Sequence, residues 1–289
     1  MKYLVVMLFL LSVIYAKSEI KLDKVEDMTT KKSMQEWLNH DFGLRPYRTN
    51  YLLPLCYADK PYKSNIPNVE YSNFEVELQI SLMIKVSDNL FGLKEKYYLS
   101  YTQHSFWQLY INSSPFRETN YNPEAFVIFP ISHKNAYFNI RSLKFAFAHQ
   151  SNGQPDTTGV VFDTNKTMGN LSKSVNYLYT TVRLQRKSMT IDLKAWYRIP
   201  EELKTDDNPD LMQYTGYTSA KMTYFFGKNM LTMMGRLNFS TGKGAVEATY
   251  SYPLIHNYFY AKVFSGYTES LIDYDNYITK VSLGFSFSR

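Results

Sequence analysis

Cysteine is almost absent from this chain of 289 residues, and glycine is sparse. The single cysteine, Cys56, excludes an intramolecular disulfide and a zinc site built from cysteines, so we expect a small buried apolar residue there. Long apolar runs are missing too: after Ala16 no stretch approaches the roughly 18 consecutive apolar residues of a membrane-spanning helix. A helical membrane protein is therefore not expected.

Clustered charge is also lacking. The formal net charge is +6, but the lysines and arginines are scattered along the chain. A nucleic-acid-binding protein concentrates its basic residues in a patch or stripe. Nucleic acid is therefore not expected as a partner.

The first 16 residues have the features of a secretory signal peptide. Lys2 gives a short basic start, Leu4 to Ile14 form a mostly apolar run, and Ala16 is a small residue suited to cleavage. We expect residues 1–16 to be removed on export and exclude them from the fold.

Aromatic residues are abundant, at 17% of the chain, with 26 tyrosines and 19 phenylalanines against 12 glycines. Such residues favour strands and form the girdles of outer-membrane barrels. Apolar and polar residues also alternate in several segments, which is the pattern of a strand with one apolar face. The clearest of these segments are 74–86, 246–252 and 281–287.

Turn-like breaks separate the alternating segments, and the runs between them number about twelve, most of them near the ~9 to 11 residues that cross a bilayer when tilted. The breaks lie at 60–67, 87–92, 132–135, 201–209, 227–229, 241–244 and 273–276. Export, an even strand number and alternation to the last residues favour a twelve-stranded antiparallel transmembrane β-barrel over 46–289. A soluble antiparallel sandwich shows the same alternation and is the alternative.

The segment from Lys17 to Arg45 differs from the rest. It is dense in charge and has a short helical pattern around Met34 to Leu38. We expect residues 17–45 to lie outside the bilayer, on the periplasmic side.

His149 and Ser151 end one alternating segment, so in a strand their side chains point to the side of Phe145 and Phe147. Asn176 shares the apolar parity of the next predicted strand. Its side-chain carbonyl could accept the imidazole N–H and leave the other ring nitrogen free to take the Ser151 proton. A neutral asparagine also avoids placing an anion beside hydrocarbon. The alternative is a chance pair, with His149 lying among lipid headgroups.

Two neighbouring features favour catalysis. Asn152 and Gly153 predict a flexible turn whose backbone N–H groups could line an oxyanion site. The following loop, 154–172, holds Asp156, Asp163 and several hydroxyls, which are ligand types suited to a hard cation such as calcium.

Five segments, in this order, also carry a family resemblance: Tyr101–Gln103 with Trp107–Leu109, Ser113–Tyr121, His149–Gly153, Ser172–Tyr179 and Ser265–Tyr274. They resemble the hallmark segments of the outer membrane phospholipases A of Gram-negative bacteria. The resemblance covers about residues 46–287, and it is specific because chance produces one short match but not five in the right order.

The resemblance implies a calcium-dependent, twelve-stranded outer-membrane enzyme that hydrolyses acyl esters of phospholipids at either position, and of lysophospholipids. It implies that the homodimer is active and the monomer inactive. Ser151 corresponds to the nucleophile, His149 to the general base and acid, and Asn176 to the orienting residue of a triad on the lipid-facing exterior. The Gly153 amide would help to stabilise the oxyanion.

The same resemblance implies the metal and dimer contacts. Calcium would be held by the backbone carbonyl of Gln154, the hydroxyl of Ser172 and the carbonyl of Ser113 of the partner subunit, while Asp156 corresponds to an acidic residue linked to calcium binding. Gln103 corresponds to a membrane-embedded glutamine at the dimer interface, where an amide in hydrocarbon gains by pairing with its symmetry mate. The alternatives are that Ser172 is an ordinary loop hydroxyl and that Gln103 faces the lumen.

The chain departs from the family pattern at three places. Gln154 stands where an arginine is familiar, which removes a positive charge near the substrate phosphate. Residues 159–168 look inserted and lengthen the loop before Asn176. The chain ends Phe287-Ser288-Arg289 and not on an aromatic residue.

A non-enzymatic outer-membrane porin or adhesin is the competing function. It predicts the same fold with His149 and Ser151 incidental, and a porin would conduct ions without cleaving esters. Twelve strands enclose little space, so we expect inward-pointing polar side chains to plug the lumen.

Overall fold

The computed structural model describes residues 27–31, 34, 43–64, 69–131, 137–157, 161–163, 166–167, 170–202 and 206–289. The chain divides into two units, Met1–Leu44 and Arg45–Arg289. The proposed signal peptide lies outside the described residues, as does most of 17–45, so these two boundaries stay predictions. In the described part of the first unit, residues 28–31 are helical, and Asp27 Oδ2 accepts a hydrogen bond from Thr30 N at 2.7 Å. Of the helix expected around Met34 to Leu38, only Met34 is described, and it is helical.

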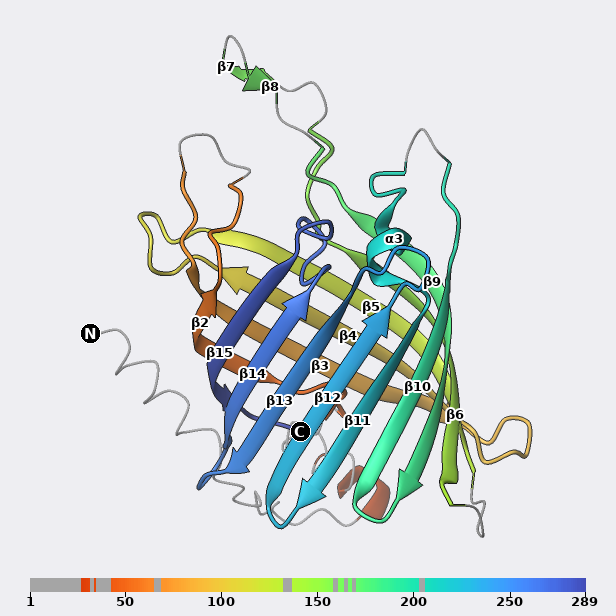
Figure 1. Cartoon of the computed structure of the whole chain (residues 1–289). Coiled ribbons are helices and arrows are strands. Elements are labelled where there is room, and N and C mark those ends of the chain that lie inside the picture. Colours follow the sequence, from red (N-terminus) through yellow and green to blue (C-terminus); the bar gives the residue numbers. More distant parts are fainter. Residues whose placement is uncertain are drawn as a thin grey trace. The chain divides into compact units, whose positions relative to one another are not determined.

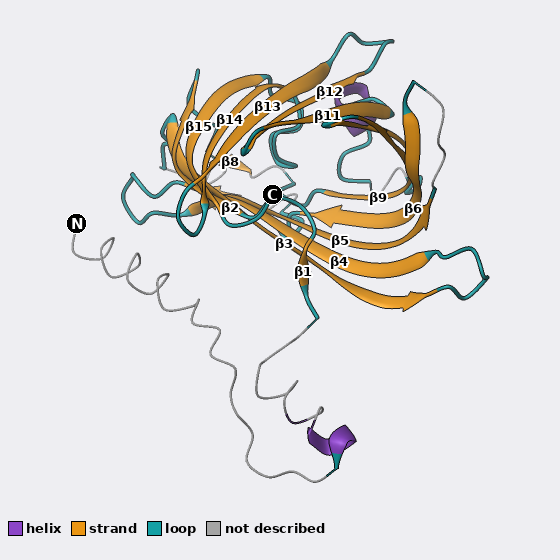
Figure 2. Cartoon of the chain, turned by 90° about the horizontal axis from the view of Figure 1, so that it is seen from below, coloured by secondary structure: helices purple, strands orange, loops and turns teal. Residues whose placement is uncertain are grey.

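The second unit is a β-barrel, shown from the side in Figure 1 and from below in Figure 2. Among the described residues, twelve long strands pair antiparallel in chain order, and the last pairs with the first, which closes the sheet. The strands are β2 (Tyr51–Ala58), β3 (Phe74–Asp88), β4 (Lys96–Trp107), β5 (Phe116–Pro130), β6 (Asn139–Ser151), β9 (Ser174–Arg186), β10 (Met189–Arg198), β11 (Thr218–Phe226), β12 (Asn229–Leu237), β13 (Gly244–Pro253), β14 (Tyr258–Gly266) and β15 (Ile278–Ser286). A short strand, β1 (Arg45–Pro46), adds to β3. The predicted barrel is confirmed, and the alternative of a soluble sandwich is wrong.

The alternation in the sequence separates the two faces of the wall. In β3 the lumen side carries buried Glu75, Glu77 and Ser81, whereas Phe74 and Ile80 on the other parity are about half exposed, at 47% and 49%. The same split runs along β15, where buried residues alternate with half-buried Thr279 and then with exposed residues. The apolar parity therefore faces outward, as expected for a wall surrounded by lipid.

Charged side chains fill the lumen. Arg117 Nε lies 3.0 Å from Glu75 Oε2, and Lys280 Nζ lies 2.8 Å from Glu77 Oε2. Lys262 also pairs with Glu77, and all five residues are at most 5% exposed. Buried charges are tolerated because each meets an opposite charge or a hydrogen-bond partner. This network supports the expectation of a plugged lumen and disfavours an open porin.

No helix within the described residues is long and apolar enough to cross a membrane.

The two ends of the barrel differ. At one end, two-residue turns such as 187–188 and 227–228 join the strands, whereas the other end carries long connections, among them 152–173 and 199–217 (Figure 1). Outer-membrane barrels have short periplasmic turns and longer extracellular loops, so the second end is the extracellular one. The long loops also contact one another. Tyr274 donates a hydrogen bond to Asp210 Oδ1 at 2.5 Å, and burial together with this bond raises the pKa of Tyr274.

Two short elements belong to these long loops. The connection 199–217 contains α3 (Leu211–Thr215), and the connection 152–173 contains the paired strands β7 (Val161–Asp163) and β8 (Lys166–Thr167). β7 and β8 fall within the 159–168 segment that looks inserted, so at least part of that segment forms a hairpin beyond the barrel rim (Figure 1).

Candidate active site

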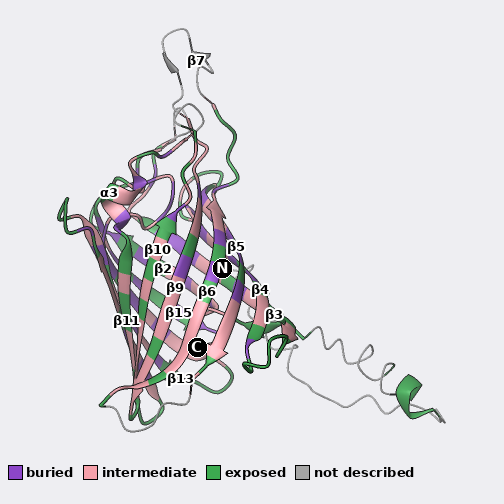
Figure 3. Cartoon of the chain, turned by 90° about the vertical axis from the view of Figure 1, so that its right-hand side faces the viewer, coloured by how far each residue is buried: buried purple, intermediate pink, exposed green. Residues whose placement is uncertain are grey.

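His149 and Ser151 lie at the extracellular end of β6, on its outward parity. Phe145 and Phe147, four and two residues before His149, are 44% and 45% exposed, whereas Ala148 on the other parity is fully buried. Figure 3 colours β6 and the neighbouring β9 by burial. In β6, exposed and buried residues alternate over 145–148, and in β9 Val175 and Tyr179 are buried. The imidazole and the hydroxyl therefore belong to the lipid-facing side of the wall.

Asn176 lies directly opposite His149 in the β6–β9 pairing. Their side chains meet, with His149 Nδ1 and Asn176 Oδ1 2.9 Å apart. The asparagine oxygen can only accept, so Nδ1 carries the proton and Nε2 is left as the acceptor. This is the tautomer that a general base needs toward a serine.

Glu201 lies behind the asparagine, at the start of the loop after β10. Asn176 Nδ2 donates to Glu201 Oε1 at 3.4 Å, and the backbone carbonyl of Asn176 accepts a hydrogen bond from Ile199 N at 2.8 Å. The amide group is thus held from both ends, with its oxygen turned toward His149. The alternation in the sequence does not indicate Glu201. This residue lies in a loop, and the loop comes near β9 only because β9 and β10 pair.

Ser151 is half-buried, and its register partners are Tyr121 in β5 and Ser174 in β9. Among the residues that the structure describes, no hydrogen bond joins the Ser151 hydroxyl to His149. Catalytic hydrogen bonds are often long in the free enzyme and tighten when substrate binds. The structure therefore places the His149 and Ser151 side chains on the same face of the wall, without the hydrogen bond through which the proton would be transferred.

Hydrogen bonds hold one side of the turn after Ser151. Asn152 is 2% exposed, its Nδ2 donates to Leu171 O at 2.8 Å, and its Oδ1 accepts from Lys173 N at 3.0 Å and Gln154 N at 3.3 Å. Gly153 follows with φ +63°, and a Cβ there would lie 2.9 Å from the Tyr121 ring. The Asn152 side chain is therefore bonded through both its oxygen and its nitrogen, and glycine is required at Gly153 by both conformation and space. That the turn is flexible stays a prediction.

Oxygen donors gather near this turn. Ser172 Oγ donates to Asp207 Oδ2 at 2.8 Å, and Ser174 N donates to Asp207 Oδ1 at 3.0 Å. Gln154 and Asp156 are exposed on the loop that leaves Ser151. Across the described residues no three His, Cys, Asp or Glu side chains gather into a metal cluster. Hydroxyl, carboxylate and backbone oxygens nevertheless form the donor set that a hard cation prefers, so these residues fit calcium.

Asp207 was missed by the sequence reasoning. It lies in the run Asp206-Asp207-Asn208, within the turn-like break 201–209 of the sequence. The signal in the sequence that could have indicated Asp207 is the pair of acidic residues Asp206 and Asp207.

Gln103 and Ser113 lie in the adjoining β4–β5 region. Gln103 shares the outward parity of Leu99 and Tyr101, which are 51% and 43% exposed, and not the lumen side. In the pairing it lies opposite Tyr121, so Gln103, Tyr121 and Ser151 form one row across β4, β5 and β6. Ser113 is exposed in the extracellular loop between β4 and β5, with φ +63°. A lumen-facing Gln103 is excluded.

Comparison with known proteins assigns the family. A family model described as Phospholipase A1 matches residues 27–287. The Phospholipase A1 of Proteus vulgaris is 35% identical over 278 residues, which cover 92% of this chain and 90% of that protein. The Phospholipase A1 of Escherichia coli K12 is 37% identical over 254 residues, which cover 85% of this chain and 82% of that protein. The chain belongs to the phospholipase A1 family.

Solved structures of phospholipase A1 relatives share the fold. An active-site mutant of Escherichia coli outer membrane phospholipase A, with an asparagine replaced by alanine, superposes with a TM-score of 0.76 at 34% identity and covers 86% of this chain and 93% of its own. The Salmonella typhi outer membrane phospholipase, a dimer with bound calcium, superposes with a TM-score of 0.76 at 36% identity, and the match covers the same shares of the two chains. The resemblance found in the sequence is confirmed, and this phospholipase A1 family member is an outer-membrane β-barrel enzyme.

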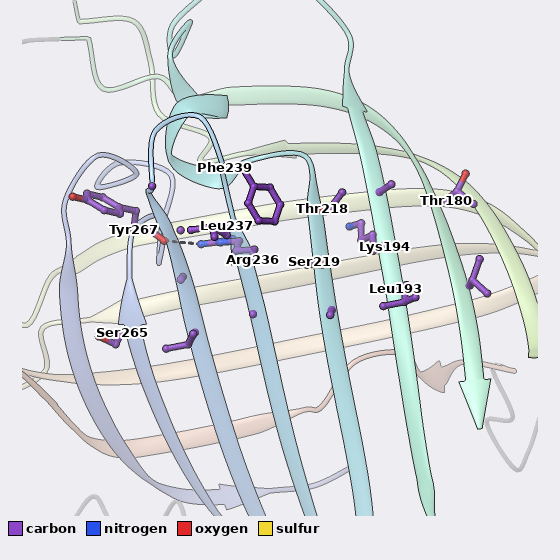
Figure 4. Close-up of a pocket in the computed structure, with 18 of the residues that line it drawn as sticks. Thr180, Leu193, Lys194, Thr218, Ser219, Arg236, Leu237, Phe239, Ser265 and Tyr267 are labelled. Carbon is purple, nitrogen blue, oxygen red and sulfur yellow. Dashed lines mark hydrogen bonds between the residues drawn. The ribbon is translucent and has the colours of Figure 1, made fainter. Parts of the chain in front are cut away.

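The outer wall of this family member also carries two apolar grooves. One lies directly below the triad candidates and is lined by Phe147 and Leu178, with Leu99, Ala125 and Tyr197 beside them. The other, drawn in Figure 4, is lined by residues of β9 to β14 and their loops, and none of the triad candidates lines it. Only the first groove continues from His149 and Asn176 along the wall.

Proposed function

We propose that this chain is a calcium-dependent phospholipase A that cleaves acyl esters of membrane phospholipids with Ser151, His149 and Asn176. One observation carries the proposal: the 2.9 Å contact between His149 and Asn176 lies on the lipid-facing wall, on the same face as Ser151. Polar side chains on such a wall cost free energy, so their gathering there favours a reaction with lipid.

The chemistry follows from the placement. Ser151 Oγ attacks the ester carbonyl while His149 Nε2 takes its proton, and Asn176 keeps the imidazole in the required tautomer. The Gly153 amide donates to the oxyanion that forms. His149 returns the proton to the leaving alcohol, and it then activates the water that releases the fatty acid from Ser151.

The substrate would reach these groups without leaving the membrane. His149 and Asn176 lie near the extracellular ends of their strands, where the wall passes from hydrocarbon to headgroups. The apolar groove below them, with Phe147 and Leu178, would receive an acyl chain. As the resemblance of the sequence segments implies, we expect cleavage at both ester positions and of lysophospholipids.

Calcium would be held by the Gln154 carbonyl and the Ser172 hydroxyl. The Asp207 carboxylate is hydrogen-bonded to Ser172, and Asp156 follows Gln154 by two residues in the sequence. Ser113 of the partner subunit would complete the protein ligands. When bound there, calcium supplies positive charge next to the oxyanion that develops on the ester carbonyl.

Activation by pairing of two barrels is part of the proposal. The Salmonella typhi relative is a dimer with bound calcium. In this chain Gln103 lies on the outward face, in one row with Ser151, so an interface built around it would border the site. A monomer would lack the partner's metal ligand and would be inactive, which protects the host membrane.

The test uses purified protein in detergent. With calcium it should release fatty acid from a phospholipid, and a chelator should lower the rate by about 10²- to 10³-fold, the effect of losing one oxyanion-stabilising group. A sulfonyl fluoride should label Ser151 only when calcium is present. Steady release after the label is attached, or a label on another residue, would overturn the assignment.

A further inference from the structure

A bulge in β5 turns two successive charged residues into the lumen. Phe106 pairs with Glu118 and the next residue, Trp107, pairs with Phe116, so Arg117 is the extra residue. Arg117 and Glu118 are 5% and 2% exposed. Bulges of this kind re-aim side chains and are frequent beside active sites. Arg117 is neutralised by Glu75 and Asp273, whereas Glu118 has a different set of partners.

Only N–H groups approach the Glu118 carboxylate in the described structure. Oε1 accepts from Asn120 Nδ2 at 2.5 Å and from Ile272 N at 3.2 Å, and Oε2 faces Asn152 Nδ2 at 3.5 Å. Asn120 Oδ1 in turn accepts from Leu271 N at 3.1 Å. The carboxylate thus joins the extracellular loop 267–277 to the residue that follows Ser151.

Asn152 cannot turn its amide around to suit another partner. Its Oδ1 already accepts from Lys173 N and Gln154 N, and its Nδ2 donates to Leu171 O. The second N–H of the Asn152 amide therefore needs an acceptor, and Glu118 is the group that faces it. A carboxylate has only acceptors and fits this place, whereas a glutamine amide would present N–H to N–H.

We propose that Glu118 is a positioning residue for the reaction, which acts from the lumen side of the wall by holding Asn152 and, through it, the Ser151–Gly153 turn. The inference rests on the proposed function, because it concerns the geometry of the same oxyanion turn. Glu118 does not touch the substrate. Its hydrogen bonds keep the Gly153 amide where charge develops in the transition state, and a small shift of such a group costs rate and not ground-state binding.

The first experiment compares Glu118→Gln with Glu124→Gln. Glu124 is matched, because it also is a buried lumen carboxylate of β5, but its partners are Tyr47, Arg48 and Tyr179. Misplacement of reacting groups by about 1 Å costs up to ~10²-fold in rate, so we expect Glu118→Gln to lower kcat by about tenfold or more with KM unchanged within about twofold. Glu124→Gln should keep kcat within about twofold while it lowers thermal stability. Equal kcat values in the two variants would overturn the proposal.

A second experiment places the effect on Asn152. Asn152→Ala leaves Glu118 its bonds to Asn120 and Ile272, so this variant should fold even if Glu118→Gln does not, and it should itself lower kcat. The double variant should lose no more than Asn152→Ala alone, because the two residues act in one chain. Additive losses, or a wild-type kcat in Asn152→Ala, would contradict the inference.

These outcomes are separable from failure of the proposed function. If the wild-type protein with calcium releases no fatty acid, the function itself is wrong. If the wild type is active and Ser151→Ala is not, the function holds, and the kcat values of the Glu118 and Asn152 variants decide the role of Glu118.

Discussion

The lumen and the outer wall near β6 and β9 treat polar side chains in opposite ways. In the lumen, the buried carboxylate of Glu75 pairs with both Arg117 and Lys280, so these charges support the barrel. On the wall, Ser151 stands on an apolar surface without a hydrogen bond to His149 among the described residues. The difference teaches that the paired charges of the lumen serve folding, whereas a serine hydroxyl on the apolar wall that is not bonded to its base is available for chemistry.

A serine from each region gives the largest expected contrast. Ser151→Ala should lower fatty acid release by at least about 10³-fold, since removing a serine nucleophile costs up to ~10⁶-fold in kcat, and leave thermal unfolding unchanged. Ser81, whose hydroxyl contacts Thr102 Oγ1 at 2.7 Å in the lumen, is the control, and Ser81→Ala should retain activity. Comparable activity in both variants would remove the distinction between the regions.

An arginine pair tests the lumen itself. Arg117→Met removes the arginine partner of Asp273 and leaves Glu75 with Lys280 alone, and it should lower the free energy of unfolding by about 3 to 5 kcal/mol. Arg183→Met breaks a partly exposed pair with Asp192 and should cost less than about 1 kcal/mol. Urea titrations of both variants in lipid vesicles measure the difference. If Arg117→Met proved as stable as Arg183→Met, the lumen network would not support the fold.

The orienting residue should show an intermediate effect. Asn176→Ala frees the imidazole to adopt the wrong tautomer and should lower kcat by about 10- to 100-fold, less than the ~10⁴-fold seen when an ionised orienting residue is neutralised. Asn229, at the periplasmic end of β12, is the control, and Asn229→Ala should not change kcat. Initial rates at saturating phospholipid in mixed micelles provide the measurement. An unchanged rate in Asn176→Ala would refute the role of the His149 contact.

A glutamine pair gives the smallest expected effect. Gln103→Leu should weaken dimerisation by about 0.6 to 1.7 kcal/mol, the range for hydrogen bonds between membrane-embedded side chains. Gln79 faces the lumen, where its amide donates to Thr49 O at 2.7 Å, so Gln79→Leu should lower stability and leave dimerisation unchanged. Energy transfer between labelled barrels in detergent reports the dimer. An unaltered dimer in Gln103→Leu would place the interface elsewhere.

Much of the fold and part of the site could be predicted from local sequence. Alternation sorts residues such as Glu75 and Ile80 onto opposite faces, because side chains two apart in a strand share a side. The same rule placed His149 and Ser151 together. It could not find the lumen placement of Arg117, because a bulge changes parity there. Nor could it find the contact of Glu118 with Ile272 or those of Asp207 and Glu201 with β9, because these contacts involve loops that come near only after the strands have paired.

The sequence by itself determined the strand pattern, the outward placement of the triad candidates and the family, because periodicity and short motifs are properties of neighbouring residues. Only the tertiary structure decided that His149 meets Asn176 at 2.9 Å, that the lumen charges are paired, and that Asn152 is fixed by Leu171 and Lys173. The reason is physical: register, bulges and loop contacts depend on how distant strands align, and barrel closure sets that alignment for all of them at once.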